Sequence, residues 1–167
     1  LITHKTNLGY GSALRSGFKN SQKDFIFYTD ADMPVSLEDI KMVLPYMEKY
    51  DLVIGYRINR EDTLRRFIYS KIYNFLLRML MGVKVKDANF SFKCIKKEAI
   101  RRCQLKAQSV FIDGELLSEA VRNRLQIKEL PVIYRPRQYG SSNFDSIKTA
   151  VFTMRELMSY WLERCFF

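Results

Sequence analysis

The stretch FIFYTDADMPVS, Phe25 to Ser36, decides how this chain is interpreted, because a hydrophobic run ends in two aspartates separated by one residue. The run Asp24–Thr29 is largely apolar and rich in β-forming residues, which predicts a central strand of a sheet. Asp30 and Asp32 follow at its end, where an extended backbone places both side chains on the same side. Two interpretations are open: the carboxylates cap the turn before a helix that begins at Ser36, or they hold a cation.

The order of the other predicted elements indicates an α/β fold with a mostly parallel sheet. A helix from Ser36 to Lys49 separates the first strand from a second one at Leu52–Tyr56, and this spacing is typical of a βαβ unit. Pro131 indicates that a further strand lies at an edge or begins irregularly. The length of 167 residues fits one domain with a sizeable core. The remaining predicted elements are helices at Ser12–Asn20, Thr63–Met81, Lys97–Cys103, Asp113–Arg124 and Asp145–Phe167, and a strand near Phe90–Ile95.

The charge balance favours an anionic partner. The chain carries 28 Lys or Arg and 18 Asp or Glu, a formal net charge of +10. Residues 57–102 hold thirteen of the basic and four of the acidic residues. The partner could be nucleic acid, an anionic membrane or a phosphorylated small molecule. The cysteines, at 94, 103 and 165, show neither metal-ligand spacing nor a disulfide framework, which favours a reducing cytosol.

Arginines at the ends of other predicted strands favour the cation interpretation of the aspartate pair. Arg57 closes the second strand, and Arg135 and Arg137 follow the strand that contains Pro131. A guanidinium group matches phosphate oxygens with two parallel hydrogen bonds. Mg²⁺ is bound by carboxylates together with substrate phosphates, and ligands of open α/β sheets sit beyond the carboxyl ends of the strands. The combination predicts a site for a nucleoside diphosphate.

Seven segments, in their order along the chain, resemble the family 2 glycosyltransferases, and most of all their polyprenyl-phosphate branch, which includes dolichol-phosphate mannose synthase. The segments are HKTNLGYGSALRSGF, TDADMP, DLVIGYR, RRFIYSKIYNFLLRML, VKDANFSFK, FIDGELL and ELPVIYRPRQYGSSNF. The resemblance implies a Rossmann-like type-A glycosyltransferase fold. It also implies inverting transfer of a hexose from a nucleotide diphosphate sugar to a polyprenyl phosphate.

The resemblance also assigns roles to individual residues. It implies that Asp30 and Asp32 bind the Mg²⁺ or Mn²⁺ ion that bridges the donor diphosphate, with Asp32 counted among the catalytic residues. Asp87 and Glu115 match acidic positions of the family and are candidates for positioning substrate, although ordinary pairing with Lys or Arg explains them equally well. The expected substrate-binding residues are Arg57, Arg66, Ser70, Arg135, Arg137 and Ser141.

Two departures from the family pattern are visible. Many relatives carry a Gln on the metal side where this chain has Pro34, so the metal is expected to rely more on water and the diphosphate. Relatives also begin with strand-helix-strand units that bind the nucleotide base, and the resemblance implies that this chain lacks them. Leu1–Thr3, which has the composition of the tail of a strand, favours the same interpretation. We therefore expect an N-terminally truncated catalytic domain over residues 1–143, followed by an amphipathic helix over 144–167.

The acceptor chemistry and the basic long helix complete the prediction. A phosphate acceptor is already largely ionised near neutral pH, so a catalytic histidine is not required and His4 is interpreted as structural.

The helix at 63–81 mixes basic and aromatic residues, which favours an interfacial position on the cytoplasmic face of a membrane; ordinary packing on the sheet is the alternative. Two other functions stay open: a family 2 glycosyltransferase with a soluble or glycan acceptor, and a non-catalytic module that binds nucleic acid.

Overall fold

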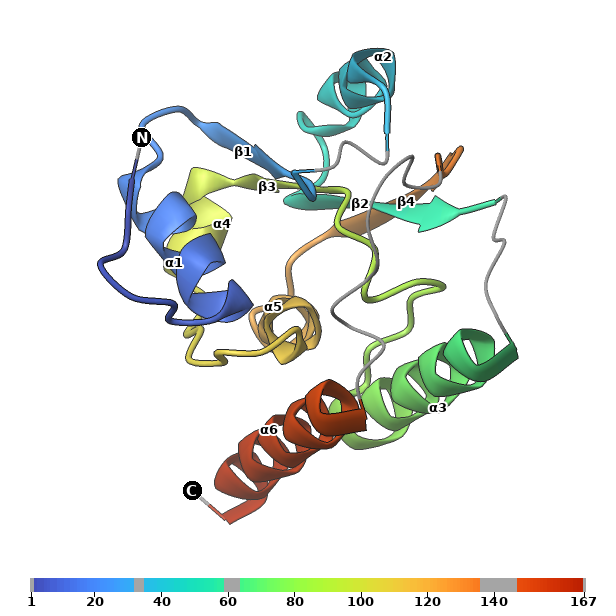
Figure 1. The fold of residues 1–167 in the computed structure, drawn as a ribbon. Coiled ribbons are helices and arrows are strands. Elements are labelled where there is room, and N and C mark those ends of the chain that lie inside the picture. The colour runs from blue at the N-terminus through green and yellow to red at the C-terminus, as the bar shows by residue number, and fades with distance from the viewer. Residues whose placement is uncertain (1, 32–34, 59–63, 136–146, 167) are drawn as a thin grey trace.

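The computed structural model describes residues 2–31, 35–58, 64–135 and 147–166. Within these ranges helices alternate with short strands along the chain, as Figure 1 shows. The elements are α1 (Tyr10–Asn20), β1 (Phe25–Tyr28), α2 (Leu37–Lys41), the 3₁₀ helix η1 (Leu44–Tyr46), β2 (Leu52–Arg57), α3 (Leu64–Met81), β3 (Lys93–Lys96), α4 (Lys97–Arg101), α5 (Phe111–Arg122), β4 (Ile127–Val132) and α6 (Ile147–Phe166).

The sheet has the strand order β1-β3-β2-β4 and mixed direction. Strand β3 runs antiparallel to both of its neighbours, β1 and β2, and only β2 and β4 pair in parallel. The prediction of a mostly parallel sheet holds for strand direction, because β1, β2 and β4 run the same way and β3 alone among the described strands runs against them. The prediction that β1 is a central strand differs from the described sheet, where β1 lies at an edge. Of the two possibilities for the strand with Pro131, the described sheet has the edge position, in β4.

The βαβ prediction holds for strand direction. Because β1 and β2 are both antiparallel to β3, they run parallel to each other with β3 inserted between them. The position of β3 between β1 and β2 could not be predicted from the sequence. Strand β3 comes from a segment some 40 residues further along the chain than β2, as the pairing of Ile54 with Lys93 shows. Ile2 and Thr3, expected as the tail of a strand, are not in a strand.

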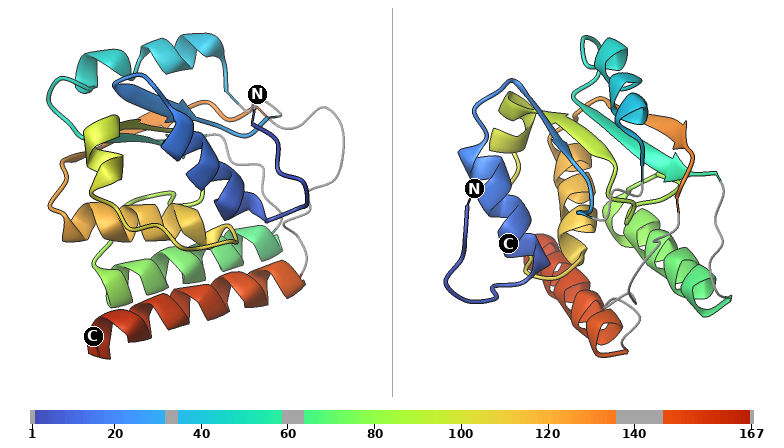
Figure 2. Two further views of the ribbon diagram at one scale, coloured as in Figure 1. Left: turned by 90° about the vertical axis from the view of Figure 1, so that its left-hand side faces the viewer. Right: turned by 45° about the horizontal axis from the view of Figure 1, so that its top comes forward.

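The two faces of the sheet pack against different helices, as the views in Figure 2 show. Along β2, Leu52 and Ile54 belong to the larger core with α1, α5 and part of α3, whereas Val53 faces a smaller core under α2 and η1. This alternation follows from the two-residue period of a strand. The helices α3 and α6 lie beyond α5 on the side of the larger core.

The helix predicted from Ser36 is confirmed at its start and wrong in its extent. The Ser36 side chain accepts the N–H of Asp39, and the Asp39 carboxylate accepts the N–H of Ser36, which completes a capping box. The α helix ends at Lys41, and Pro45 lies in the 3₁₀ helix that follows. A proline lacks the N–H group that a continuing α helix needs, so a single helix to Lys49 does not form.

Helix α6 is an integral part of the larger core. Its Leu157 and Tyr160 are buried in the same cluster as α5, and the ring of Tyr160 meets that of Phe111 at a centroid distance of 5.5 Å. The predicted division between a domain and a terminal helix falls among residues 136–146, which lie outside the described ranges.

Candidate active site

The carboxyl ends of β1 and β2 lie at the same edge of the sheet. Tyr28 of β1 and Ile54 of β2 both pair with Lys93 of β3, so the two strands are in step at that level. Asp30 follows two residues beyond Tyr28, and Arg57 three residues beyond Ile54. The fold therefore brings a half-buried carboxylate and a guanidinium group to one edge, as the sequence predicted. Asp32, the second residue of the pair, lies outside the described residues.

Arg57 is held by two kinds of contact. Its Nε and Nη2 donate to the two carboxylate oxygens of Asp87 at 2.7 and 3.0 Å, a bidentate ion pair. The guanidinium carbon also lies 5.4 Å from the ring centroid of Phe90 and 5.5 Å from that of Tyr134. Planar guanidinium groups are stabilised over aromatic faces. The candidate Asp87 thus contacts the candidate Arg57 directly, which is the pairing that the sequence left open for it.

Ser70 of α3 lies close to the loop that carries Asp87. The side chain of Asn74 donates to the carbonyl of Ser70 at 2.8 Å and accepts the N–H of Ala88 at 3.2 Å. One turn of α3 is therefore joined to the residue directly after Asp87. Arg66 is half-buried one turn earlier on the same helix.

The remaining arginine candidates follow β4. Arg135 is exposed two residues after an exposed Ile133. Arg137 and Ser141 lie outside the described residues, so their predicted substrate contacts stay predictions.

Glu115 has the contacts of a structural residue. It is buried in α5, and its carboxylate accepts the N–H of Lys106 at 2.9 and 3.0 Å and that of Ala107 at 2.9 Å. Burial is the largest influence on its pKa and raises it, and the two backbone donors act in the opposite direction. Both features favour the structural alternative over a contact with substrate.

Two further glutamates complete the attachment of the loop at residues 104–109. Glu119 accepts the N–H of Gln104 at 2.9 Å, and Glu156 of α6 accepts those of Gln108 and Ser109 at 2.9 and 3.0 Å. Together with Glu115 they bind most of the loop's N–H groups. The spacing of Glu115 and Glu119, one helical turn apart, was the only sequence signal for this arrangement.

A buried charged cluster under the sheet edge was missed by the sequence analysis. Lys93 and Asp113 are 0% and 1% exposed, and Lys93 Nζ lies 2.5 Å from Asp113 Oδ1. The hydroxyl of Tyr28 donates to the same oxygen at 2.8 Å. Lysine and aspartate are almost never fully buried unless they are paired. Asp113 is 20 residues from Lys93 and 85 residues from Tyr28 in the chain, so no local sequence pattern predicts the cluster.

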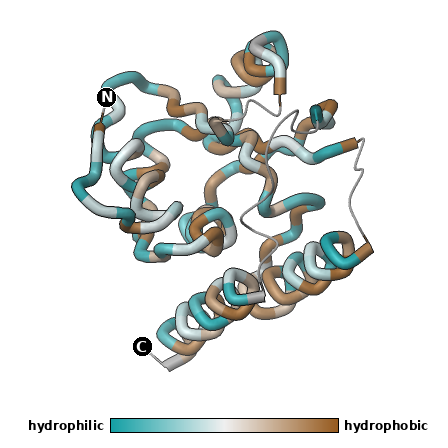
Figure 3. The backbone as a smooth tube through the Cα atoms, viewed as in Figure 1, coloured by the Kyte–Doolittle hydropathy of each residue, from teal (hydrophilic) through white to brown (hydrophobic). Residues whose placement is uncertain are grey.

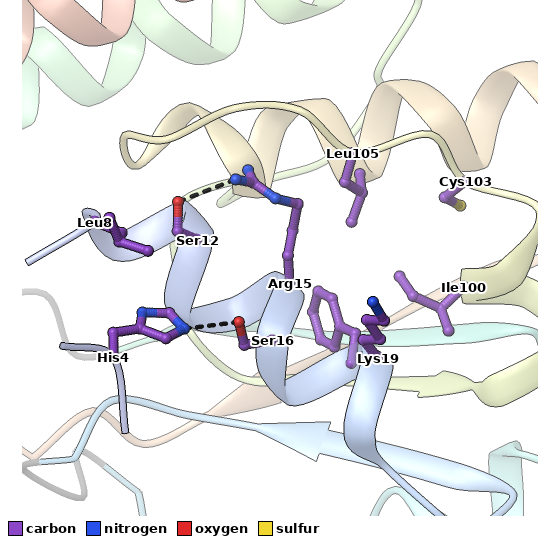
Figure 4. Close-up of a pocket in the computed structure, with 10 residues that line it drawn as sticks. His4, Leu8, Ser12, Arg15, Ser16, Lys19, Ile100, Cys103 and Leu105 are labelled. Carbon is purple, nitrogen blue, oxygen red and sulfur yellow. Dashed lines mark hydrogen bonds between the residues drawn. The ribbon is translucent and has the colours of Figure 1, made fainter. Parts of the chain in front are cut away.

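A surface pocket of about 480 Å³ lies elsewhere, between the N-terminal segment, α1 and the segment around α4, as Figure 4 shows. His4 Nε2 lies 2.8 Å from Ser16 Oγ at this pocket, which agrees with the structural interpretation of the histidine. Arg15 contacts Ser12 and the carbonyl of Ala107. The pocket lining contains none of the predicted site residues.

The donor chemistry at the sheet edge fits a hard divalent ion. Within the described ranges no three His, Cys, Asp or Glu side chains converge as a complete metal site. Asp30 supplies carboxylate oxygens, the ligands that Mg²⁺ and Mn²⁺ prefer, and such ions complete their shell with water and substrate phosphates. One or two carboxylates therefore suffice for a diphosphate-bound metal.

Among solved structures, the fold is similar to that of glucosyl-3-phosphoglycerate synthase from Mycobacterium tuberculosis. The complex with Mn²⁺, UDP-glucose and phosphoglyceric acid aligns with a TM-score of 0.73 and 16% identity, covering 94% of this chain and 55% of that one. The complex with Mn²⁺, UDP and glucosyl-3-phosphoglycerate aligns with a TM-score of 0.72 and 15% identity, with the same coverage. This likeness shows the Rossmann-like α/β fold of type-A glycosyltransferases.

Sequence comparisons give closer relatives. The undecaprenyl-phosphate 4-deoxy-4-formamido-L-arabinose transferase of Pectobacterium atrosepticum is 29% identical over 146 residues, covering 85% of this chain and 43% of the relative. The dodecaprenyl-phosphate galacturonate synthase of Rhizobium johnstonii is 27% identical over 153 residues, covering 89% and 45%. The chain thus spans less than half the length of these relatives. The family model of glycosyl transferase family 2 matches residues 1–104, more than half of the chain, and with the edge geometry and the fold this shows that the chain belongs to glycosyl transferase family 2.

Proposed function

We propose that this protein transfers a hexose from a nucleotide diphosphate sugar to a polyprenyl phosphate at a membrane surface, with inversion and with Mg²⁺ or Mn²⁺. The observation that carries the proposal is that Asp30 and Arg57 lie at the carboxyl ends of β1 and β2, at the same edge of the sheet. A carboxylate can bind the metal ion that accompanies a diphosphate, and a guanidinium can bind the phosphate oxygens directly. The names of the sequence relatives, which carry undecaprenyl or dodecaprenyl phosphate, support the lipid acceptor.

In the proposed reaction a phosphate oxygen of the acceptor attacks the anomeric carbon of the sugar, and the nucleoside diphosphate departs. A bound Mg²⁺ or Mn²⁺ ion supplies Lewis-acid stabilisation of the leaving diphosphate. Asp30 and Asp32 hold that ion. Arg57 stabilises the negative charge that develops on the leaving group, and Asp87 keeps its guanidinium in place before the substrate arrives. No residue has to remove a proton from the acceptor, because a phosphate monoester is already largely ionised near neutral pH.

The proposed membrane surface is the outer side of α3. Its apolar side chains Leu64, Phe75 and Met79 are 74%, 60% and 66% exposed, and Arg65 and Lys71 lie among them. Figure 3 shows hydrophobic and hydrophilic segments alternating along this helix. Basic side chains near an anionic lipid surface contribute about 1 kcal/mol each, and aromatic side chains favour the interface. Exposed apolar side chains in α6, among them Val151 and Phe152, extend the same proposal to that helix.

Within the described residues, no helix combines the length and the apolar character needed to cross a bilayer.

The test of the proposed function is a transfer assay with a panel of nucleotide sugars and undecaprenyl phosphate. We expect product with one of the sugars, loss of product on addition of EDTA, and recovery with Mn²⁺. Asp30→Asn and Asp32→Asn are expected to abolish transfer while the circular dichroism spectrum stays that of the unaltered protein. The matched control is Glu38→Gln, which changes an exposed carboxylate on α2. Transfer to phosphoglycerate with none to the lipid would replace the proposed acceptor by a soluble one, and full activity of Asp30→Asn would refute the metal site.

A further inference from the structure

We propose that Tyr28, Asp113 and Lys93 form a positioning cluster, which fixes the end of β1 and thereby the Asp30 carboxylate that holds the metal. This inference rests on the proposed function, because it gives these three buried residues a part in the same metal site.

The cluster is built around one carboxylate oxygen. Asp113 Oδ1 accepts the hydroxyl of Tyr28 at 2.8 Å and the ammonium of Lys93 at 2.5 Å. The same ammonium donates to the carbonyl of Phe90 at 2.6 Å and lies 5.5 Å from the centre of the Tyr28 ring. Tyr28, Asp113 and Lys93 are 8%, 1% and 0% exposed. Hydrogen bonds to charged groups are stronger when solvent is excluded, so the arrangement is rigid.

The position of the cluster explains why the end of β1 needs it. Strand β1 has only four residues, and within the described sheet it pairs with β3 alone. Short edge strands with a partner on one side open locally at low free-energy cost. Tyr28 is the last residue of the strand, and its hydroxyl joins it to Asp113 in the first turn of α5, a contact that does not depend on the strand ladder. Asp30 comes two residues after Tyr28, so fixing the position of Tyr28 also restricts the position of Asp30.

The side chain of Tyr10 shows that the cluster and Asp30 share one neighbourhood. Burial is the largest cause that raises the pKa of Tyr10, and the negative charges of Asp113 and then Asp30 raise it further. Asp113 and Asp30 are therefore both within electrostatic reach of the Tyr10 side chain.

Stability alone is a poor reason for this ion pair. A buried pair contributes little net stability, because removing two charges from water costs about as much as their attraction returns. Asp113 Oδ2 has no hydrogen-bond partner among the described residues, which adds to that cost. The buried ion pair is better explained by its effect on geometry, because it fixes the end of β1 next to the proposed metal ligand.

The test compares two tyrosine variants that are matched in structure. Tyr28→Phe removes a hydroxyl that donates to a buried carboxylate at 2.8 Å, and Tyr160→Phe removes one that donates to the buried Glu119 at 2.9 Å, remote from Asp30 in the sequence and on α6. Each carboxylate also has a basic partner, Lys93 or Arg164. Binding of Mn²⁺ alone is measured by the electron paramagnetic resonance signal of the free ion, and stability by thermal unfolding.

We expect both variants to lose similar thermal stability, and only Tyr28→Phe to weaken Mn²⁺ binding, by roughly tenfold, the low end of what changes around metal ligands cost. The double variant Lys93→Met, Asp113→Asn removes both charges together and is expected to fold and to show the same weakened binding. Equal Mn²⁺ affinity in Tyr28→Phe and Tyr160→Phe, or unaltered affinity in the double variant, would overturn the inference.

The variant Asp30→Asn separates this inference from the proposed function. If Asp30→Asn binds Mn²⁺ as well as the unaltered protein does, the metal site itself is wrong and the cluster has nothing to position. If Asp30→Asn loses the ion and Tyr28→Phe does not, the metal site stands and only the positioning role is refuted.

Discussion

The guanidinium of Arg57 and the carboxylate of Asp87 form a two-pronged ion pair, and the guanidinium also lies beside the rings of Phe90 and Tyr134. Arg57 closes β2, whereas Asp87 lies in the segment between α3 and β3, so the pair joins two parts of the chain that meet only in the folded protein. The ion pair fixes the orientation of the guanidinium, and a preorganised group of this kind is what a site for a departing diphosphate requires.

Replacing Arg57 by Lys tests whether the two-pronged geometry matters. Lysine keeps the charge but cannot donate two parallel hydrogen bonds or stack a planar group on an aromatic ring. We expect transfer to fall by roughly a hundredfold, the scale for losing one preorganised donor. The measurement is kcat at saturating donor. The control is Lys106→Ala, which breaks the exposed pair with Glu163 and should change neither kcat nor stability appreciably. An unchanged kcat in Arg57→Lys would limit Arg57 to a structural role.

Replacing Asp87 by Asn tests the other side of the pair. The amide keeps the shape of the carboxylate and removes its charge, and Asp87 is only 3% exposed. We expect the free energy of unfolding to fall by about 3 kcal/mol, the lower end for removal of one partner of a buried pair, since the side chain of Arg57 stays 15% exposed. Chemical denaturation measures this value. A change below that of the exposed Lys106→Ala variant would contradict the assignment.

Glu115→Gln separates a structural glutamate from a catalytic one. The carboxylate accepts two backbone N–H groups, and an amide offers only one oxygen in their place. We expect a loss of about 1–3 kcal/mol in the free energy of unfolding, with kcat unchanged for the folded protein. The two readouts are denaturant unfolding and the transfer assay. Loss of kcat without loss of stability would restore Glu115 to the catalytic residues.

The pH dependence of the same variant has a definite sign. Because burial raises the pKa of Glu115 above its ordinary value of 4.5, the folded protein holds this proton more tightly than the unfolded chain does. Its contribution to stability is therefore most favourable below pH 4.5 and declines as the pH rises through the raised pKa. We expect the stability of the unaltered protein relative to Glu115→Gln to decrease from pH 4 to pH 7 in thermal unfolding. An increase over that range would mean that the backbone donors outweigh burial.

The sequence predicted features that depend on residues close together in the chain, and it did not predict features that depend on residues far apart. Ser36 predicted the start of a helix, which the structure confirms, and the apolar run Leu52–Tyr56 predicted a strand, which forms as β2. The order of strands was not available, because β3 enters between β1 and β2 from far along the chain.

The same reasoning applies to the candidate site. The position of Asp30 and Arg57 at one edge could be predicted because each follows or ends a predictable strand, and their roles stay predictions. The partners Lys93 and Asp113 were not, because their pairing exists only after the sheet and α5 have packed together. The Asp87 contact with Arg57 was left open for that reason, and it is now a direct one.

Phe75→Asp tests the proposed membrane surface. Phe75 is 60% exposed on α3, so its replacement does not disturb the core. We expect binding to anionic vesicles to weaken by about tenfold, since burying a Phe side chain is worth about 1.5–3 kcal/mol and an added negative charge is repelled by the lipid. Vesicle co-sedimentation measures this. Ile133→Asp is the control, because Ile133 directly follows β4, is 54% exposed and has no part in the proposed surface. Equal weakening by both variants would remove α3 as the membrane face.

Gly114→Ala tests how α3 packs on α5. A Cβ atom at position 114 would lie 2.3 Å from the hydroxyl oxygen of Tyr73 and 3.0 Å from Cδ2 of Leu77. Both side chains are buried, so neither has room to move, and we expect a loss of about 1–3 kcal/mol in the free energy of unfolding. Gly17→Ala in α1 is the control: its Cβ meets nothing within 4 Å, so alanine should add about 0.5–1 kcal/mol there.

The second variant Tyr73→Phe makes the Gly114 test specific. The hydroxyl of Tyr73 has no hydrogen-bond partner among the described residues, so its removal alone should cost little. Combined with Gly114→Ala, it removes the closest contact of the new methyl group and is expected to restore most of the lost stability in chemical denaturation. If the double variant is as unstable as Gly114→Ala alone, the two helices do not meet at this point, and the packing that sets α3 on α5 beside Asp113 has to be revised.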